Sequence, residues 1–158
     1  MTTWPLQSQC DDFYGNPRGA NAHANPAWEA QYLTTVPVPF HMYYAGANPV
    51  THIRINKNCA ASLSRVLDRL WNAAGKSQAK IDSWGVSVFG GSYNYRLMRG
   101  SNRLSMHSYG CAIDLDPANH PMVHGSKPFA QEVIDAFAAE GWVNLPNDKM
   151  HFQAARVN

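Results

Sequence analysis

Two histidines and two aspartates in the C-terminal third of the chain have the types and spacing of a metal-dependent hydrolase. His107 and Asp114 lie within the ten-residue stretch Ser105–Asp114, and Asp148 and His151 follow near the C-terminus. Zinc hydrolases use three protein ligands, leave a fourth position open and keep a general base off the metal. The helical pattern H-E-x-x-H is absent, so we expect ligands from loop and strand positions far apart in the sequence.

The segment Cys111–Asp116 has the alternation of a β-strand with one polar face. Its odd positions are apolar, and its even positions carry Asp114 and Asp116. Because side chains alternate along a straight strand, His107 and Asp114 would face opposite sides of the sheet. Gly110 lies between them, and we expect it to supply the turn or bulge that brings both side chains toward one point.

The spacing resembles the pattern of the M15 zinc peptidases, a family that includes D-Ala-D-Ala dipeptidases and carboxypeptidases and phage L-alanyl-D-glutamate endolysins. The family pattern, S-x-H-x-x-G-x-A-x-D followed by D-x-x-H, is matched at Ser105, His107, Gly110, Ala112, Asp114, Asp148 and His151. The resemblance covers residues 83–157. It implies that His107, Asp114 and His151 bind Zn²⁺, and that Asp148 is the general base.

The resemblance also implies a catalytic arginine. Many family members carry a Tyr-Arg pair whose guanidinium lies near the scissile carbonyl, and Tyr95-Arg96 matches it here. Arg99 lies three residues further on and competes with Arg96 for this role. Ser105 is expected to support a ligand through a hydrogen bond and not to act as a nucleophile, because no G-x-S-x-G motif is present.

Other polar groups near the motif are interpreted as structural. Asp116 is expected to accept hydrogen bonds in the loop that follows the strand. His120 and His124 lie in a segment rich in Pro and Gly, where exposed loop histidines that do not line the cleft are the default. Cys111 falls on the apolar face, which favours packing over metal ligation.

Length and composition indicate a single domain without nucleic-acid-binding character. The chain has 158 residues and a formal net charge of +2, which suits an anionic polymer such as peptidoglycan. No run of Lys and Arg and no base-stacking motif predicts a nucleic-acid site. Three scattered cysteines do not suggest a disulfide framework, and this fits a reducing cytoplasm.

The first ten residues lack a basic start and an apolar core, so no signal peptide is expected, and no stretch reaches transmembrane length. We therefore expect no stable membrane insertion. The protein is also expected to be a monomer. It would be made in the host cytoplasm and act on the cell wall in the periplasm after release, as phage endolysins do.

The remaining pattern predicts the elements that position the site. Residues 1–35 are expected to form an extension packed on the core, and residues 36–158 the catalytic domain. The aromatic residues of the extension could bind glycan, but packing is favoured for Trp4, Phe13, Tyr14 and Trp28. Strands are expected over Val36–Tyr44, Thr51–Asn56, Trp84–Phe89 and His151–Val157, with Asp148 in the loop before the last. One helix would run from a cap at Asn58 to Gly75, and another from Ser126 and Pro128 to Gly141.

This order of elements predicts an α+β fold. We expect a small, mostly antiparallel sheet with helices packed on one side and the zinc in a groove on its open face. The resemblance implies the same fold, which the M15 peptidases share with the hedgehog signalling domain.

The expected function is a zinc-dependent peptidase acting on the peptidoglycan stem peptide, with L-alanyl-D-glutamate as the bond cleaved. A D-alanyl-D-alanine carboxypeptidase or dipeptidase with the same chemistry is the nearest alternative. A zinc module used only for binding, as in hedgehog-like domains, would have no need of Asp148 and Arg96. A serine hydrolase built on Ser105, His107 and Asp114 lacks its expected motif.

Overall fold

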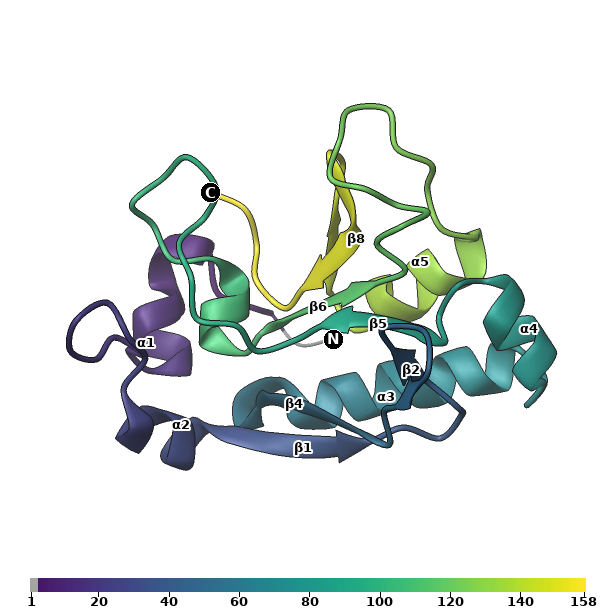
Figure 1. Ribbon diagram of the computed structural model, residues 1–158, viewed down its shortest axis with the longest axis horizontal. Helices are drawn as coiled ribbons and strands as arrows, with labels where there is room; N and C mark the ends of the chain where they lie inside the picture. The colour runs from purple at the N-terminus through teal and green to yellow at the C-terminus, as the bar shows by residue number, and fades with distance from the viewer. Residues whose placement is uncertain (1–2) are drawn as a thin grey trace.

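The computed structural model describes residues 3–158 and shows the α+β architecture that the sequence predicts (Figure 1). The strands are β1 (Leu33–Pro37), β2 (Tyr43–Tyr44), β3 (Asn48–Pro49), β4 (His52–Asn56), β5 (Val88–Gly91), β6 (Ala112–Leu115), β7 (Val143–Leu145) and β8 (Asp148–Gln153). The helices are α1 (Cys10–Tyr14), α2 (Pro26–Tyr32), α3 (Lys57–Ala73), α4 (Gln78–Ser83) and α5 (Gln131–Ala138), with short 3₁₀ helices η1 (Gln7–Gln9) and η2 (Met106–Tyr109).

The main sheet is mostly antiparallel, as predicted. Its six strands have the order β3-β2-β5-β6-β8-β7, and only β2 and β5 run parallel. A separate antiparallel pair joins β1 to β4. In Figure 1 this pair and α3 lie on one side of the main sheet, and the loops near residues 100 and 120 rise on the other. The sheet therefore has one face covered by α3 and one face bordered by loops.

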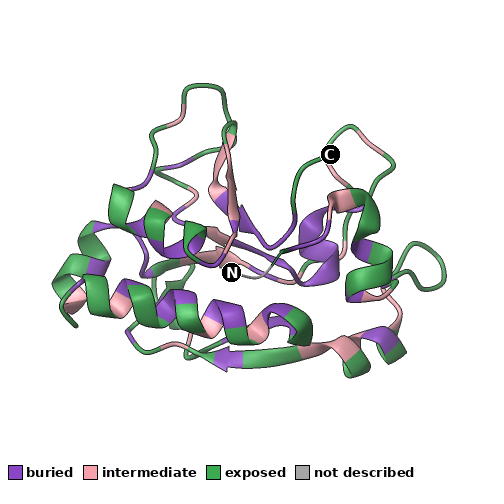
Figure 2. Cartoon of the chain, turned by 180° about the vertical axis from the view of Figure 1, so that it is seen from behind, coloured by how far each residue is buried: buried purple, intermediate pink, exposed green. Residues whose placement is uncertain are grey.

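One apolar core lies between α3 and the main sheet. Leu63 and Leu70 of α3, Ile113 of β6 and Phe152 of β8 are all buried in it. In Figure 2 the buried positions of α3 form a stripe along the helix, and its remaining surface is exposed. This is the helical spacing of apolar residues that the sequence shows.

The helix α3 begins two residues earlier than the sequence suggested. Its cap is Asn56, whose side-chain oxygen accepts a hydrogen bond from the Asn58 backbone N–H at 2.9 Å, so the prediction of Asn58 as the cap was wrong. The helix ends before Gly75, which has φ of +64°.

The N-terminal segment packs on the core and on the C-terminal segment. The Tyr14 hydroxyl donates to the Ala154 carbonyl at 2.7 Å, and the Trp4 indole N–H donates to the Glu140 carbonyl at 2.8 Å. Trp28 is buried as well, but Phe13 is 38% exposed, so the expectation that it packs on the core was wrong in part. The division into residues 1–35 and 36–158 stays a prediction, and β1 spans its boundary.

The bounds of several predicted elements were wrong. The strand predicted over Val36–Tyr44 is divided, because β1 ends at Pro37 and β2 holds only two residues. Trp84 caps α4 and does not open a strand; β5 begins at Val88. The second long helix begins at Gln131 and not near Pro128. Among the described residues no helix is both long and apolar enough to cross a bilayer.

Candidate metal centre

Two of the three predicted ligands meet because their strands are neighbours. Asp114 of β6 and His151 of β8 are directly paired in the antiparallel register. Residues opposite each other in such a pair project to the same face of the sheet. The Asp114 Oδ1 atom lies 3.3 Å from the His151 Nδ1 atom. The pairing therefore joins two ligands from distant parts of the sequence.

The third ligand comes from the short helix η2. The Ser105 hydroxyl accepts a hydrogen bond from the His107 backbone N–H at 3.2 Å, which caps the helix. Gly110 ends it with φ of +67°, and its carbonyl accepts from the Asn56 N–H at 2.7 Å. The turn predicted at Gly110 is thus confirmed, and it brings His107 Nε2 to within 3.2 Å of Asp114 Oδ1.

Each imidazole has one ring nitrogen held by a partner outside the cluster. His107 Nδ1 lies 2.7 Å from the Ser92 carbonyl oxygen, which can only accept, so Nδ1 donates and Nε2 keeps its lone pair. His151 Nε2 lies 2.8 Å from the Gln153 side-chain oxygen, which leaves the lone pair of His151 on Nδ1. These two lone pairs and the Asp114 carboxylate face one another.

This arrangement fits a zinc ion. The two facing nitrogens, His107 Nε2 and His151 Nδ1, are 3.1 Å apart. Neither nitrogen is protonated, so neither can donate a hydrogen bond to the other. The buried Asp114 Oδ1 has no hydrogen-bond partner. Ligand atoms at ~2.0–2.1 Å from a tetrahedral ion are separated by about 3.3 Å, close to all three distances between these atoms. A cation would satisfy three acceptors that otherwise only face one another.

The electrostatics of the cluster also favour an ionised carboxylate. Burial raises the pKa of Asp114, but in the absence of a metal the adjacent imidazoles of His107 and His151 outweigh burial when they are protonated, through hydrogen bonds and positive charge, so that the Asp114 pKa lies well below the ordinary range. Asp114 is therefore negatively charged near neutral pH, as a metal ligand must be.

The fourth predicted residue, Asp148, lies beside the cluster and outside it. Its Oδ2 is 3.9 Å from His151 Nδ1, and it is not one of the three residues whose donor atoms converge. Burial raises the pKa of Asp148, and the negative charge of Asp114 adds to this effect. Asp148 is the first residue of β8 and not part of a preceding loop, so the predicted strand His151–Val157 was wrong at both ends.

Arg96 projects from a loop that is tied to η2. Its backbone N–H donates to the Ser108 hydroxyl at 2.9 Å, and that hydroxyl donates to the Arg96 carbonyl at 2.7 Å. The guanidinium is exposed, and its charge acts on Asp148 in the direction that lowers the Asp148 pKa. Arg99 is also exposed and lies on the same loop. Sequence reasoning missed Ser108, although it lies inside the motif stretch.

The other polar residues near the motif have different surroundings. Asp116 accepts hydrogen bonds from the Asn119 side-chain amide at 3.0 Å through both oxygens, in the turn after β6. His120 is only 5% exposed and stacks on Phe129, with ring centroids 3.8 Å apart, so the expectation of an exposed histidine was wrong there. His124 is exposed, as predicted.

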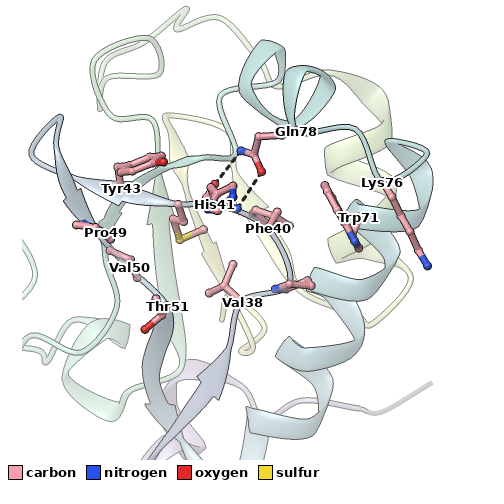
Figure 3. A pocket seen from close by; sticks show the side chains of 12 residues that line it. Val38, Phe40, His41, Tyr43, Pro49, Val50, Thr51, Trp71, Lys76 and Gln78 are labelled. Atoms are coloured by element: carbon pink, nitrogen blue, oxygen red, sulfur yellow. Dashed lines mark hydrogen bonds between the residues drawn. The ribbon is translucent and has the colours of Figure 1, made fainter.

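A cavity of about 510 Å³ lies elsewhere, between the β2–β3 strands and the end of α3 (Figure 3). Phe40 and Trp71 line it, with ring centroids 5.9 Å apart. The Gln78 side-chain oxygen accepts a hydrogen bond from the His41 backbone N–H, and the Gln78 side-chain nitrogen donates to the His41 carbonyl. The side chain thus pairs with His41 as the backbone of a neighbouring strand does. The lining includes none of the predicted catalytic or metal-binding residues, so this cavity is not part of the predicted site.

Comparison with known proteins agrees with the motif. Residues 99–154 match a family described as D-alanyl-D-alanine carboxypeptidase, one of the M15 peptidases, and this segment holds all three candidate ligands and Asp148. No curated protein and no solved structure was found to match the chain. The resemblance of this sequence to the M15 peptidases is therefore confirmed over residues 99–154.

Proposed function

We propose that this protein is a zinc-dependent peptidoglycan peptidase that cleaves the L-alanyl-D-glutamate bond of the stem peptide in bacterial lysis. The observation that carries the proposal is the convergence of His107 Nε2, Asp114 Oδ1 and His151 Nδ1, with a separate carboxylate, Asp148, beside them. A purely structural zinc site is closed by four ligands and has no use for an adjacent base. The match over residues 99–154 supports the reaction class.

Each residue of the site would have a separate role in peptide hydrolysis. His107, Asp114 and His151 would hold Zn²⁺, which when bound polarises the peptide carbonyl and lowers the pKa of its bound water toward ~7. Asp148 would accept the proton of the attacking water and deliver it to the leaving amine. Burial raises the pKa of Asp148 above the ordinary carboxylate value, which is the direction that helps a group that must take up a proton. Arg96 would offset the negative charge that develops on the carbonyl oxygen.

The choice of the L-alanyl-D-glutamate bond rests on the resemblance of the sequence motif to that of phage endolysins. An endolysin role would place synthesis in the host cytoplasm and action at the wall in the periplasm.

A D-alanyl-D-alanine carboxypeptidase is the second candidate, because the matched family carries that description. An exopeptidase needs a cation for the free carboxylate of its substrate. Arg96 is exposed, and its positive charge lowers the pKa of Asp148. We propose that in a carboxypeptidase Arg96 would bind the substrate carboxylate.

Mass spectrometry of fragments released from purified Gram-negative peptidoglycan separates the two candidates. We expect a new free N-terminus on D-glutamate with intact glycan strands. Release of single D-alanine would establish the carboxypeptidase instead. Intact stem peptides after incubation with zinc-loaded protein would contradict both.

A further inference from the structure

Gln153 has a buried side chain that contacts the candidate ligand His151 at the ring nitrogen that faces away from the candidate metal site. It lies two residues after His151 on β8, so both side chains project from the same face of the strand. Its Oε1 is 2.8 Å from His151 Nε2, and the residue is 1% exposed. It pairs across the sheet with Ala112, a small residue that leaves space for the glutamine.

The orientation of the Gln153 amide is fixed by what lies on its other side. Its Nε2 donates to the Ala155 carbonyl at 2.9 Å and to the Gln7 side-chain oxygen at 2.8 Å. A backbone carbonyl only accepts, so the amide nitrogen must face Ala155 and the amide oxygen must face His151. An oxygen in that place requires a proton on His151 Nε2, and this leaves the Nδ1 lone pair facing His107 and Asp114.

The second acceptor, Gln7, comes from the N-terminal segment. Its backbone N–H donates to the Arg156 carbonyl at 2.9 Å, and the Arg156 N–H donates to the Pro5 carbonyl at 2.8 Å. The N-terminal segment is thus bonded along the chain just after β8. It lies outside residues 99–154, the segment that carries the family match.

We infer that Gln153 is a positioning residue that fixes the tautomer of His151, and that Gln7 holds Gln153 in place from the N-terminal segment. The inference rests on the proposed zinc site, because a fixed Nδ1 lone pair has a purpose only if a metal binds there. Partners of this kind set both ring orientation and basicity of a histidine ligand, and their loss typically costs roughly 10- to 100-fold in metal affinity.

The test combines imidazole nitrogen NMR on the metal-free protein with zinc affinity measured by competition against a chelator. In the wild type, neutral His151 should carry its proton on Nε2. Gln153→Met should lose this preference and bind zinc roughly 10- to 100-fold more weakly. Gln153→Glu keeps an acceptor for the Nε2 proton and should recover part of the affinity. Gln7→Leu should give a smaller loss than Gln153→Met.

Asn144 offers a matched control. Its side-chain amide donates to the His151 backbone carbonyl at 2.9 Å, so it supports the same residue without touching the ring. Asn144→Leu should lower thermal stability and leave the His151 tautomer unchanged.

A wild-type His151 protonated on Nδ1 would overturn the inference, and so would unaltered zinc affinity in Gln153→Met. Equal changes in Asn144→Leu and Gln153→Met would also overturn it, because they would reveal a general effect on β8. If Gln153→Met does not fold, the wild-type spectrum and Gln7→Leu decide the question. Neither readout depends on peptide hydrolysis, so a protein that binds zinc with a fixed tautomer but cleaves nothing would contradict only the proposed function.

Discussion

Asp114 and His151 face each other across the β6–β8 pair, with Asp114 Oδ1 3.3 Å from His151 Nδ1. Because side chains alternate along a strand, a slip of β8 by one residue would turn His151 into the core and remove it from the site. Phe152, the next residue, is fully buried on the opposite face and opposes such a slip. The apolar core thus fixes the register that assembles the metal centre.

Asp148→Asn should keep the fold and the zinc affinity but lose most of the turnover, because Asp148 is placed as the base and not as a ligand. Loss of a general acid–base group typically costs about 10²- to 10⁴-fold in rate. Zinc content, thermal melting and release of peptide fragments measure the three quantities on one sample.

Asp116→Asn is the matched control for this prediction. The Asp116 carboxylate binds Asn119 in a turn, so its substitution should change turnover little. If Asp148→Asn hydrolysed peptidoglycan at the normal rate while Asp116→Asn did not, the base would have to be Asp116.

Arg96→Ala should act mainly on kcat. A positive charge near the carbonyl oxygen stabilises the transition state more than the ground state, and loss of such a donor costs about 100- to 1000-fold in rate. Arg96→Lys keeps the charge without the planar guanidinium and should recover part of the activity. Arg99→Ala should have a small effect; a large loss there with a tolerant Arg96 would transfer the role to Arg99.

Gly110→Ala should destabilise the protein and weaken zinc binding. Gly110 has φ of +67°, and an added Cβ would lie 2.7 Å from Leu33 Cδ2 and 3.1 Å from the Asn56 nitrogen. Left-handed backbone alone costs roughly 1–2 kcal/mol with a Cβ, and the contacts add to this. Urea unfolding and chelator competition measure the two effects.

Gly75→Ala separates the two contributions, because Gly75 has φ of +64° but open space around its Cβ position. Gly75→Ala should lower the free energy of unfolding by the cost of a Cβ at positive φ, and it should leave the zinc affinity unchanged. Equal destabilisation of both variants would mean that the close contacts at Gly110 are unimportant.

Stability should fall in acid partly through Glu140. The Arg65 guanidinium donates to this buried carboxylate at 3.0 Å and lowers the Glu140 pKa; burial opposes the effect, and the Ser62 hydroxyl reinforces it. A lowered folded-state pKa gives stability that is present above the ordinary value of 4.5 and lost as the pH falls through the folded-state pKa.

Denaturant unfolding of Glu140→Gln at several pH values tests this. The variant should be less stable than the wild type at pH ~7, and the difference should shrink below pH ~4.5. Glu132→Gln, at an exposed position of α5, is the control and should show no such pH dependence. A difference between Glu140→Gln and the wild type that does not change with pH would contradict the proposed linkage.

The sequence predicted the elements whose local pattern matches their environment. The body of α3 was found because one face of the helix is buried, which produces a clear periodicity. The strand at Asp114 was found because apolar residues alternate with aspartates, although both of its faces are mostly buried. Trp84 and Val86 are also buried, but one caps α4 and the other lies in the turn after it. A short apolar run of this kind does not distinguish a strand from a helix end.

The site was predictable only where it depends on residue type and spacing. The donor groups of His107, Asp114 and His151 follow from the motif, and the structure brings them together. Ser92 acts through its backbone carbonyl, which any residue offers. Gln7 is 146 residues away from Gln153, and no local pattern links them. Gln153 itself shares the strand face of His151, so the alternation could have indicated it.

The most direct test of the zinc peptidase assignment follows hydrolysis of purified peptidoglycan while zinc is returned to chelator-treated protein. Hydrolysis should be absent without metal and should rise with added zinc until each chain holds a single ion, and His151→Ala should neither retain zinc nor recover activity. Full hydrolysis by the metal-free protein, or zinc retained at wild-type affinity by His151→Ala, would contradict the account.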